Sequence, residues 1–338
     1  MMILQPKFIF RQYLAMTGNT GIFDENHGHS GCNFVAEMAE FWISRMVYNE
    51  ATGQYDIREV MGPDEYHANI TNNVYTNIIA AMAVNFANFS QCVAACDSIP
   101  DEWVEMSRKL ALEYDEEEDY HPQHQGYTEG TVIKQADTVL AGYPLMYNME
   151  TSTRRNDLEK YESVTDPGGP AMTWGMFAVG YLELGETDRA VELFQRSYQP
   201  YYHHPFYMWT ENVNGTGAIN FLTGMGGFLQ GIMFGYFGIR TRLDKLEFNP
   251  VLPEDITEMK LTGVDYYSNE FDVKVSQEEI VMDFYKVENQ VVVVHGESEE
   301  LFVGSTITIR LPRQRFHIKP NIDNFLRTCH LPDDTIGY

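Results

Sequence analysis

The chain has 338 residues, which is enough for about two domains of roughly 150 residues and for sizeable hydrophobic cores. Its 23 Lys and Arg against 49 Asp and Glu give a net charge of -26, which repels nucleic acids and anionic membrane surfaces. We therefore expect no nucleic acid and no membrane as partners, and a hydrophobic content of 44% excludes a disordered chain.

Apolar residues recur at helical spacing in about eight segments of the first two thirds of the chain. In order, these are residues 33–48, residues 74 into the nineties, a segment after the N-cap Asp101, and residues 132–140, 152–164, 171–184, 187–198 and 220–230. Short loops without strand alternation separate them. The pattern predicts successive helix pairs, as in an α-toroid or a helical repeat, over residues 1–242.

After Arg242 the pattern changes to short runs of alternating polar and apolar residues. Asn, Gly and Glu turns separate these runs, which is typical of antiparallel strands. We predict a small antiparallel β-domain, sandwich-like, over residues 243–313 and an irregular tail over residues 314–338.

Four cysteines are scattered along the chain: Cys32, Cys92, Cys96 and Cys329. Cys92 and Cys96 would share a helical face, but no second pair follows at the spacing of a zinc site, so buried free thiols are predicted. The start of the chain lacks the apolar core and cleavage site of a signal peptide. A glycan on the sequon at Asn69 would block the site described next, so we expect a cytoplasmic protein.

Two adjacent carboxylates, Asp64 and Glu65, follow the tight turn that Pro63 favours. A carboxyl group beside apolar and aromatic surface keeps its proton near neutral pH and can protonate a glycosidic oxygen. We assign this acid to Glu65, because Asp64 is the better N-cap for a helix beginning near Tyr66. The alternative is that both carboxylates only cap and face solvent.

Two further stretches carry candidate site residues. Lys134 and Gln135 fall inside the predicted helix at 132–140, where a buried ammonium needs a partner; the alternative is a lysine stem that reaches the surface. Trp209 and Glu211 lie in a loop, where an indole can cover a sugar face and a carboxylate can engage water or hydroxyls. The alternative is a loop glutamate beside a packed tryptophan.

The run from Val60 to His67, with the Asn-rich residues 72–77 behind it, resembles the catalytic-acid segment of glycoside hydrolase family 65. The resemblance continues through residues 134–137, 169–180 and 209–230 and into the β-domain. It implies a mainly α chain with a partial (α/α)6 barrel, a six-hairpin toroid, followed by the β-domain. That family contains disaccharide phosphorylases, acid trehalases and a glucosidase that acts on the glycan of collagen.

The resemblance also implies roles for individual residues. Glu65 is the proton donor, and Glu211 is the candidate base. The substrate-binding residues are Tyr66, His67, Lys134, Gln135, Trp174, Trp209 and Asn212. The substrate is a carbohydrate, and no metal or cofactor is needed.

The mechanism follows from what is absent at residues 169–174. In phosphorylase relatives, a serine-rich loop that binds phosphate stands at this segment. This chain has no such loop there. A hydrolase that inverts needs a second carboxylate to activate water, which a phosphorylase does not. We therefore predict an inverting hydrolase, with the Glu65 and Glu211 carboxyl groups roughly 6.5–9.5 Å apart.

The chain enters the family pattern in the middle of the barrel, without the N-terminal β-sandwich and the Trp-Asp substrate motif of the family. We expect a fragment or a shortened relative, whose open barrel wall would expose apolar faces and favour a homo-oligomer. Three functions remain: an α-glucosidase acting on glucosylgalactosyl-hydroxylysine, a trehalose- or kojibiose-type hydrolase or phosphorylase, and an inactive sugar-binding relative.

Overall fold

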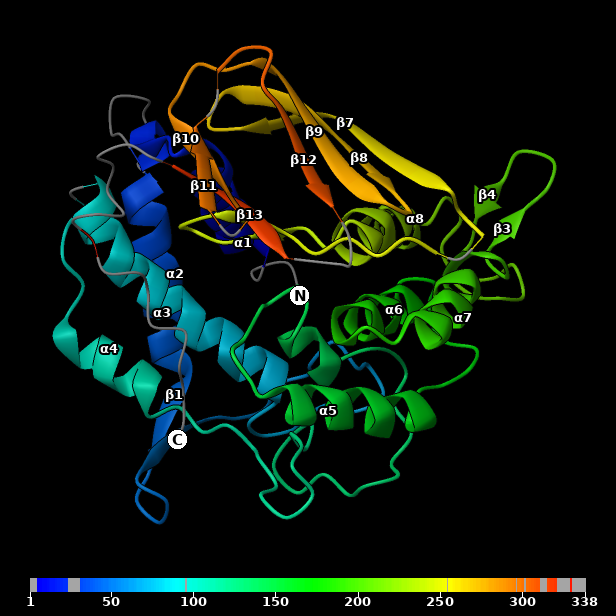
Figure 1. Ribbon diagram of the computed structural model, residues 1–338. Coiled ribbons are helices and arrows are strands. Elements are labelled where there is room, and N and C mark those ends of the chain that lie inside the picture. Colours follow the sequence, from blue (N-terminus) through cyan, green and yellow to red (C-terminus); the bar gives the residue numbers. More distant parts are fainter. Residues whose placement is uncertain are drawn as a thin grey trace.

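A computed structural model of the chain describes residues 5–23, 31–94, 96–253, 255–295, 297–300, 302–310, 315–320 and 329. The first two thirds of the chain are helical, and the last third forms antiparallel strands that pack against the helices (Figure 1). A mainly α protein with a C-terminal β-region is therefore confirmed. The division into domains at residues 242 and 313 stays a prediction.

The helices appear close to most of their predicted positions. They are α1 (Gln5–Thr17), α2 (Gly31–Arg45), α3 (Val74–Ala94), α4 (Asp101–Arg108), α5 (Thr151–Val164), α6 (Thr173–Leu184), α7 (Thr187–Tyr198) and α8 (Leu222–Gln230), which a π-turn (Gly231–Tyr236) continues. Asp101 is the first residue of α4 and not its cap, because Pro100 takes the N-cap position. The helix predicted over 33–48 ends at Arg45, where a hairpin of β1 (Met46–Asn49) and β2 (Gln54–Ile57) begins.

Helix α3 is the centre of the first hydrophobic core and packs between α2 and α4 (Figure 1). It is long and apolar enough to cross a membrane, but 72% of its most apolar window is buried inside the protein. That burial is what a core helix of a globular fold shows. A second core lies between α5, α6 and α7, with Leu158, Phe177 and Leu193 almost fully buried.

The strands from residue 240 onward form two antiparallel sheets that share a third core. One sheet has the order β11-β10-β13-β6-β5 and the other the order β12-β9-β8-β7. Their bounds are β5 (Arg240–Thr241), β6 (Leu246–Phe248), β7 (Glu258–Tyr266), β8 (Asn269–Ser276), β9 (Glu279–Lys286), β10 (Val291–His295), β11 (Glu297–Glu300), β12 (Thr306–Arg310) and β13 (Phe316–Pro320). Because β13 pairs with β6 and β10, the segment predicted as irregular after residue 313 contains a strand; the other residues of that tail, apart from 315 and 329, lie outside the described ranges.

All four cysteines form disulfides, so the prediction of free thiols is wrong. Cys32 pairs with Cys96 across the ends of α2 and α3, and Cys92 on α3 pairs with Cys329 near the end of the chain. The sequence separations of 64 and 237 residues hid this pairing, because spacing alone does not reveal connectivity. Both bonds converge on the C-terminal end of α3.

We expect the unreduced protein, unfolded in denaturant, to show no thiol that reacts with a maleimide. Reduction should lower the free energy of unfolding by about 2–5 kcal/mol, because the Cys92 to Cys329 bond restricts a very long loop in the unfolded chain. Mass spectrometry after labelling, and urea denaturation with and without reductant, measure both. Labelling of cysteines without reduction would contradict the pairing.

Candidate active site

The predicted acid segment lies in a loop between β2 and α3. Residues 65 and 66 form a turn, and no helix begins near Tyr66. The Asp64 carboxylate accepts a hydrogen bond from the Tyr66 amide at 3.1 Å, as an N-cap would, but the chain stays irregular until α3. Asp64 is fully buried, whereas the Glu65 side chain is 45% exposed. The prediction that Asp64 caps a helix is therefore wrong.

Asp64 connects the acid segment to two other parts of the chain. Its Oδ1 accepts a hydrogen bond from the Lys134 amide at 2.7 Å, and its Oδ2 accepts one from Gln123 Nε2 at 3.1 Å. The same Oδ2 lies 2.5 Å from His67 Nδ1. A buried carboxylate loses its hydration and is tolerated only with such partners. These contacts therefore fix how the three segments lie against one another.

Asp137 is a second fully buried carboxylate in this network. Its Oδ2 accepts a hydrogen bond from the Asp64 amide and its Oδ1 one from Asn73 Nδ2, both at 2.9 Å. Asn73 in turn accepts a bond from the Thr76 amide and so caps α3. A Cβ at Gly62 would collide with the Asp137 and Asn73 side chains. Burial raises the pKa of Asp137 to about 6.

Lys134 lies in an extended loop, so the helix predicted over residues 132–140 is wrong. Only Thr138–Ala141 forms a short 3-10 turn. The reason is that distant partners take the backbone groups a helix would need: the Lys134 amide donates to Asp64, and the Ile133 amide donates to the last residue of α5. Apolar periodicity in this segment reflects burial within a loop.

The side chains of this loop reach back to the acid segment. Lys134 Nζ lies 2.5 Å from Glu65 Oε2, and the two form an ion pair. Gln135 is buried, and its Nε2 donates a hydrogen bond to the carbonyl oxygen of Pro63. The alternative, a lysine whose ammonium group is free in solvent, is therefore wrong. The Lys-Gln step and the acid segment form one unit.

The second candidate carboxylate, Glu211, lies in the loop after β4 (Met208–Trp209), which pairs with β3 (Tyr202–His203). Its Oε2 accepts a hydrogen bond from the Ala218 amide at 3.0 Å. Gly217, with φ of 78°, leaves room for the glutamate, because a Cβ there would come within 2.7 Å of it. The preceding Trp209 is half-buried, with its ring centroid 6.0 Å from that of Phe228 on α8.

One loop, residues 166–172 between α5 and α6, joins the two carboxylate-bearing segments. The Asp166 amide donates to the carbonyl oxygen of Ile133 at 2.8 Å, beside Lys134. Five residues later, the Ala171 amide donates to the carbonyl oxygen of Glu211 at 3.0 Å. The structure thus anchors both predicted catalytic segments to this connecting loop.

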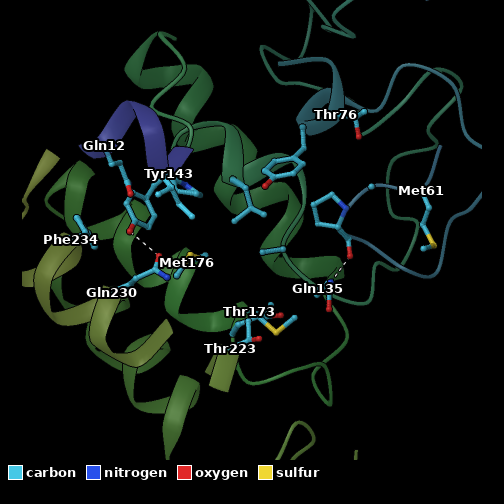
Figure 2. Close-up of a pocket in the computed structure, with 18 residues that line it drawn as sticks. Gln12, Met61, Thr76, Gln135, Tyr143, Thr173, Met176, Thr223, Gln230 and Phe234 are labelled. Atoms are coloured by element: carbon cyan, nitrogen blue, oxygen red, sulfur yellow. Dashed lines mark hydrogen bonds between the residues drawn. The ribbon is translucent and has the colours of Figure 1, made fainter. Parts of the chain in front are cut away.

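A cavity of about 480 Å³ opens beside this unit. Figure 2 shows Gln135, Thr173 and Thr223 on its wall, together with Tyr143, which donates a hydrogen bond to Gln230 at 2.9 Å. The lining carries amide, hydroxyl, methionine and aromatic groups and, among the described residues, no charged side chain. Of the predicted site residues only Gln135 lines it, so Glu65, Lys134, Trp209 and Glu211 lie outside this cavity.

Trp174 is predicted to bind sugar, but the structure buries it. Its side chain is 1% exposed, and the Arg196 guanidinium lies 3.5 Å from the centre of its ring. A buried indole cannot cover a sugar face, so the structure corrects this assignment and makes Trp174 a core residue. Its neighbour Thr173, in contrast, lines the cavity.

Sequence reasoning missed the groups that hold the site together, namely Asp137, Asn73 and Asp166. Asp137 and Asn73 did stand in the runs that carry the family resemblance, which is the only local signal they give. Tyr66, His67 and Asn212 keep partially or fully exposed side chains in the two loops. No group of three His, Cys, Asp or Glu suited to a metal occurs among the described residues.

Two models of one protein family match the chain. The glycosyl hydrolase family 65 central catalytic domain matches residues 7–131, and the C-terminal domain of the same family matches residues 239–301. Among curated proteins, the protein-glucosylgalactosylhydroxylysine glucosidase of Danio rerio is 40% identical over 315 residues, which cover 91% of this chain and 47% of the relative. That of Gallus gallus is 44% identical over 274 residues, covering 80% and 38%.

More distant matches share the fold or part of the sequence. A kojibiose hydrolase of Flavobacterium johnsoniae is 32% identical over 75% of this chain and 36% of its own length. A solved protein from the human microbiome, provisionally named a kojibiose phosphorylase, superposes with a TM-score of 0.73 at 16% identity, over 90% of this chain and 46% of the other. The chain thus spans about half the length of the relatives it matches, or less.

We expect Asp64→Ala to lower the free energy of unfolding by at least about 3 kcal/mol, because it leaves several buried donors without an acceptor. Asp265→Ala, at an exposed position on β7, is the matched control and should cost less than about 0.5 kcal/mol. Urea denaturation followed by circular dichroism measures both. Equal stabilities of the two variants would contradict the anchoring role of Asp64.

The raised pKa of Asp137 makes stability depend on pH in a defined direction. Between its ordinary value of 3.8 and about 6, the folded protein holds a proton that the unfolded chain has lost, so stability increases as pH falls through this window. Relative to Asp137→Asn, the wild type should gain about 1 kcal/mol from pH 7 to pH 5. Urea denaturation at several pH values measures this. Parallel pH profiles of the two proteins would show that Asp137 does not titrate there.

Proposed function

The chain belongs to glycosyl hydrolase family 65, and from this membership we propose that it is an inverting α-glucosidase. The proposed reaction removes the terminal glucose from glucosylgalactosyl-hydroxylysine, the substrate class in the names of relatives that are 38% to 44% identical. The observation that carries the proposal is the joining of the Glu65 and Glu211 segments by one connecting loop.

The proposed chemistry uses the two glutamates on opposite faces of the sugar. In the proposed step the ion pair with Lys134 opens, and the Glu65 carboxylate takes up a proton from solvent. Glu65 then donates this proton to the glycosidic oxygen as the bond from that oxygen to the anomeric carbon breaks. Glu211 takes a proton from a water molecule, whose oxygen attacks the same carbon from the opposite face. The product is β-glucose, and galactosyl-hydroxylysine leaves. Lys134 pairs with Glu65 in the free protein, and in this proposal it binds a hydroxyl of the arriving sugar.

We assign the helices to part of an (α/α)6 barrel. Their succession as pairs, their family and the fold of the solved relative support this. Ile9 on α1 and Leu222 and Leu229 on α8 are exposed, at 62%, 77% and 58%. Such faces favour association with a second chain. A homo-oligomer that covers them remains part of this proposal.

Two alternatives have their own support. Kojibiose hydrolases and acid trehalases are also similar to the chain, though at lower identity, so a disaccharide is the second candidate substrate. A phosphorylase is less favoured, because the connecting loop has no serine-rich phosphate site. An inactive sugar-binding relative is the third reading.

The cytoplasmic location stays a prediction. Two disulfides are typical of oxidising compartments and weigh against it.

We expect Glu65→Gln and Glu211→Gln each to lower the rate of glucose release by about 10²–10⁴-fold, because each removes one proton transfer. Glu40→Gln, at an exposed position on α2, is the matched control and should keep the rate. The assay follows glucose release from glucosylgalactosyl-hydroxylysine by NMR, which also identifies the anomer. Full activity of Glu211→Gln, or α-glucose as first product, would refute the inverting mechanism.

We also expect the rate to be the same with and without inorganic phosphate. Glucose 1-phosphate among the products would identify a phosphorylase. Binding of the glycoside without any turnover in the wild-type chain would favour the inactive relative.

A further inference from the structure

Asp166 carries a charge that no cation in the described part of the chain offsets. Its Oδ2 accepts a hydrogen bond from the Tyr66 hydroxyl at 2.6 Å, and its Oδ1 accepts one from the Gly168 amide at 2.8 Å. Both donors are neutral. The Tyr66 hydrogen bond, followed by the Gly168 bond, lowers the pKa of Asp166, so its carboxyl group is charged at neutral pH.

The other carboxylates near the predicted acid are less accessible to a cationic ligand. Glu65 is paired with Lys134. Asp64 and Asp137 are fully buried, and Asp64 contacts His67. Asp166, in contrast, is only partly buried. Of these four carboxylates, it is therefore the one that a cationic ligand can reach without displacing a cation of the protein.

Two connections place Asp166 beside the predicted acid. Tyr66 directly follows Glu65 in the chain, and its hydroxyl holds the carboxylate of Asp166. The backbone of Asp166 is bonded to Ile133, the residue before Lys134. A general acid protonates the leaving oxygen, so the aglycone leaves on the side of Glu65. Asp166 therefore lies one tyrosine side chain away from the segment that carries the acid, and in the proposed complex the aglycone lies on this side.

The candidate substrates differ on that side by a charge. Hydroxylysine carries an amine that is protonated at neutral pH, one galactose away from the bond to be cleaved, whereas kojibiose and trehalose have no charged group. We propose that Asp166, positioned by Tyr66, binds the ammonium group of the hydroxylysine aglycone and selects it over neutral disaccharides. This inference rests on the proposed function. The net charge of -26 also favours the approach of a cationic ligand.

The test compares one glycoside in two charge states. Binding of glucosylgalactosyl-hydroxylysine and of its N-acetylated form is measured by NMR titration, and glucose release from each is followed in parallel. Asp166→Asn removes the charge and keeps one acceptor oxygen, so either the Tyr66 hydroxyl or the Gly168 amide still has an oxygen to donate to. Asp265→Asn, on β7, removes the same charge at an exposed distant position and serves as control.

We expect the wild type and Asp265→Asn to bind the free amine roughly tenfold to a hundredfold more tightly than the acetylated form. In Asp166→Asn this preference for the free amine over the acetylated form should disappear. A wild type that binds both forms equally, or a preference that survives in Asp166→Asn, would overturn the role of Asp166 alone. A wild type that binds neither form would overturn the proposed function as well.

Discussion

The candidate site depends on the burial of one carboxylate, that of Asp64. A charge removed from water must find donors inside the protein, and the donors nearest to Asp64 come from three separate segments. Satisfying this carboxylate therefore sets the course of the acid loop and of the Lys134 loop at once. The ion pair between Glu65 and Lys134 follows as a consequence, because both side chains leave backbones that Asp64 has already positioned.

Close backbone packing extends this arrangement to the second glutamate. A Cβ at Gly169 would meet the carbonyl oxygen of Lys134, so the connecting loop can approach the Lys134 loop only because it has a glycine there. Two residues further on, the same loop is bonded to the backbone of Glu211. The segments that carry the two candidate catalytic groups are thus joined through main-chain contacts of the connecting loop.

In the proposed complex, the neutral cavity and the charged groups have different roles in recognition. Amide and hydroxyl groups beside methionine and tyrosine suit an uncharged sugar, and Gln135 belongs both to this wall and to the acid unit. Asp166 lies apart from that wall, and in the proposed complex its charge faces the aglycone. A disaccharide would use the first set of contacts, whereas a glycosylated hydroxylysine could use both.

The sequence by itself determined the helical and β-rich regions and pointed to Glu65 and Glu211, because apolar periodicity and motif spacing are local properties. It did not determine the loop at Lys134, the burial of Trp174 or the two disulfides. The amide of Lys134 is satisfied by Asp64, 70 positions away, and Cys92 is joined to a cysteine 237 positions away. Partners this far apart in sequence meet only when the chain has folded. Because they bind the backbone groups that a helix over 132–140 would need, that helix does not form.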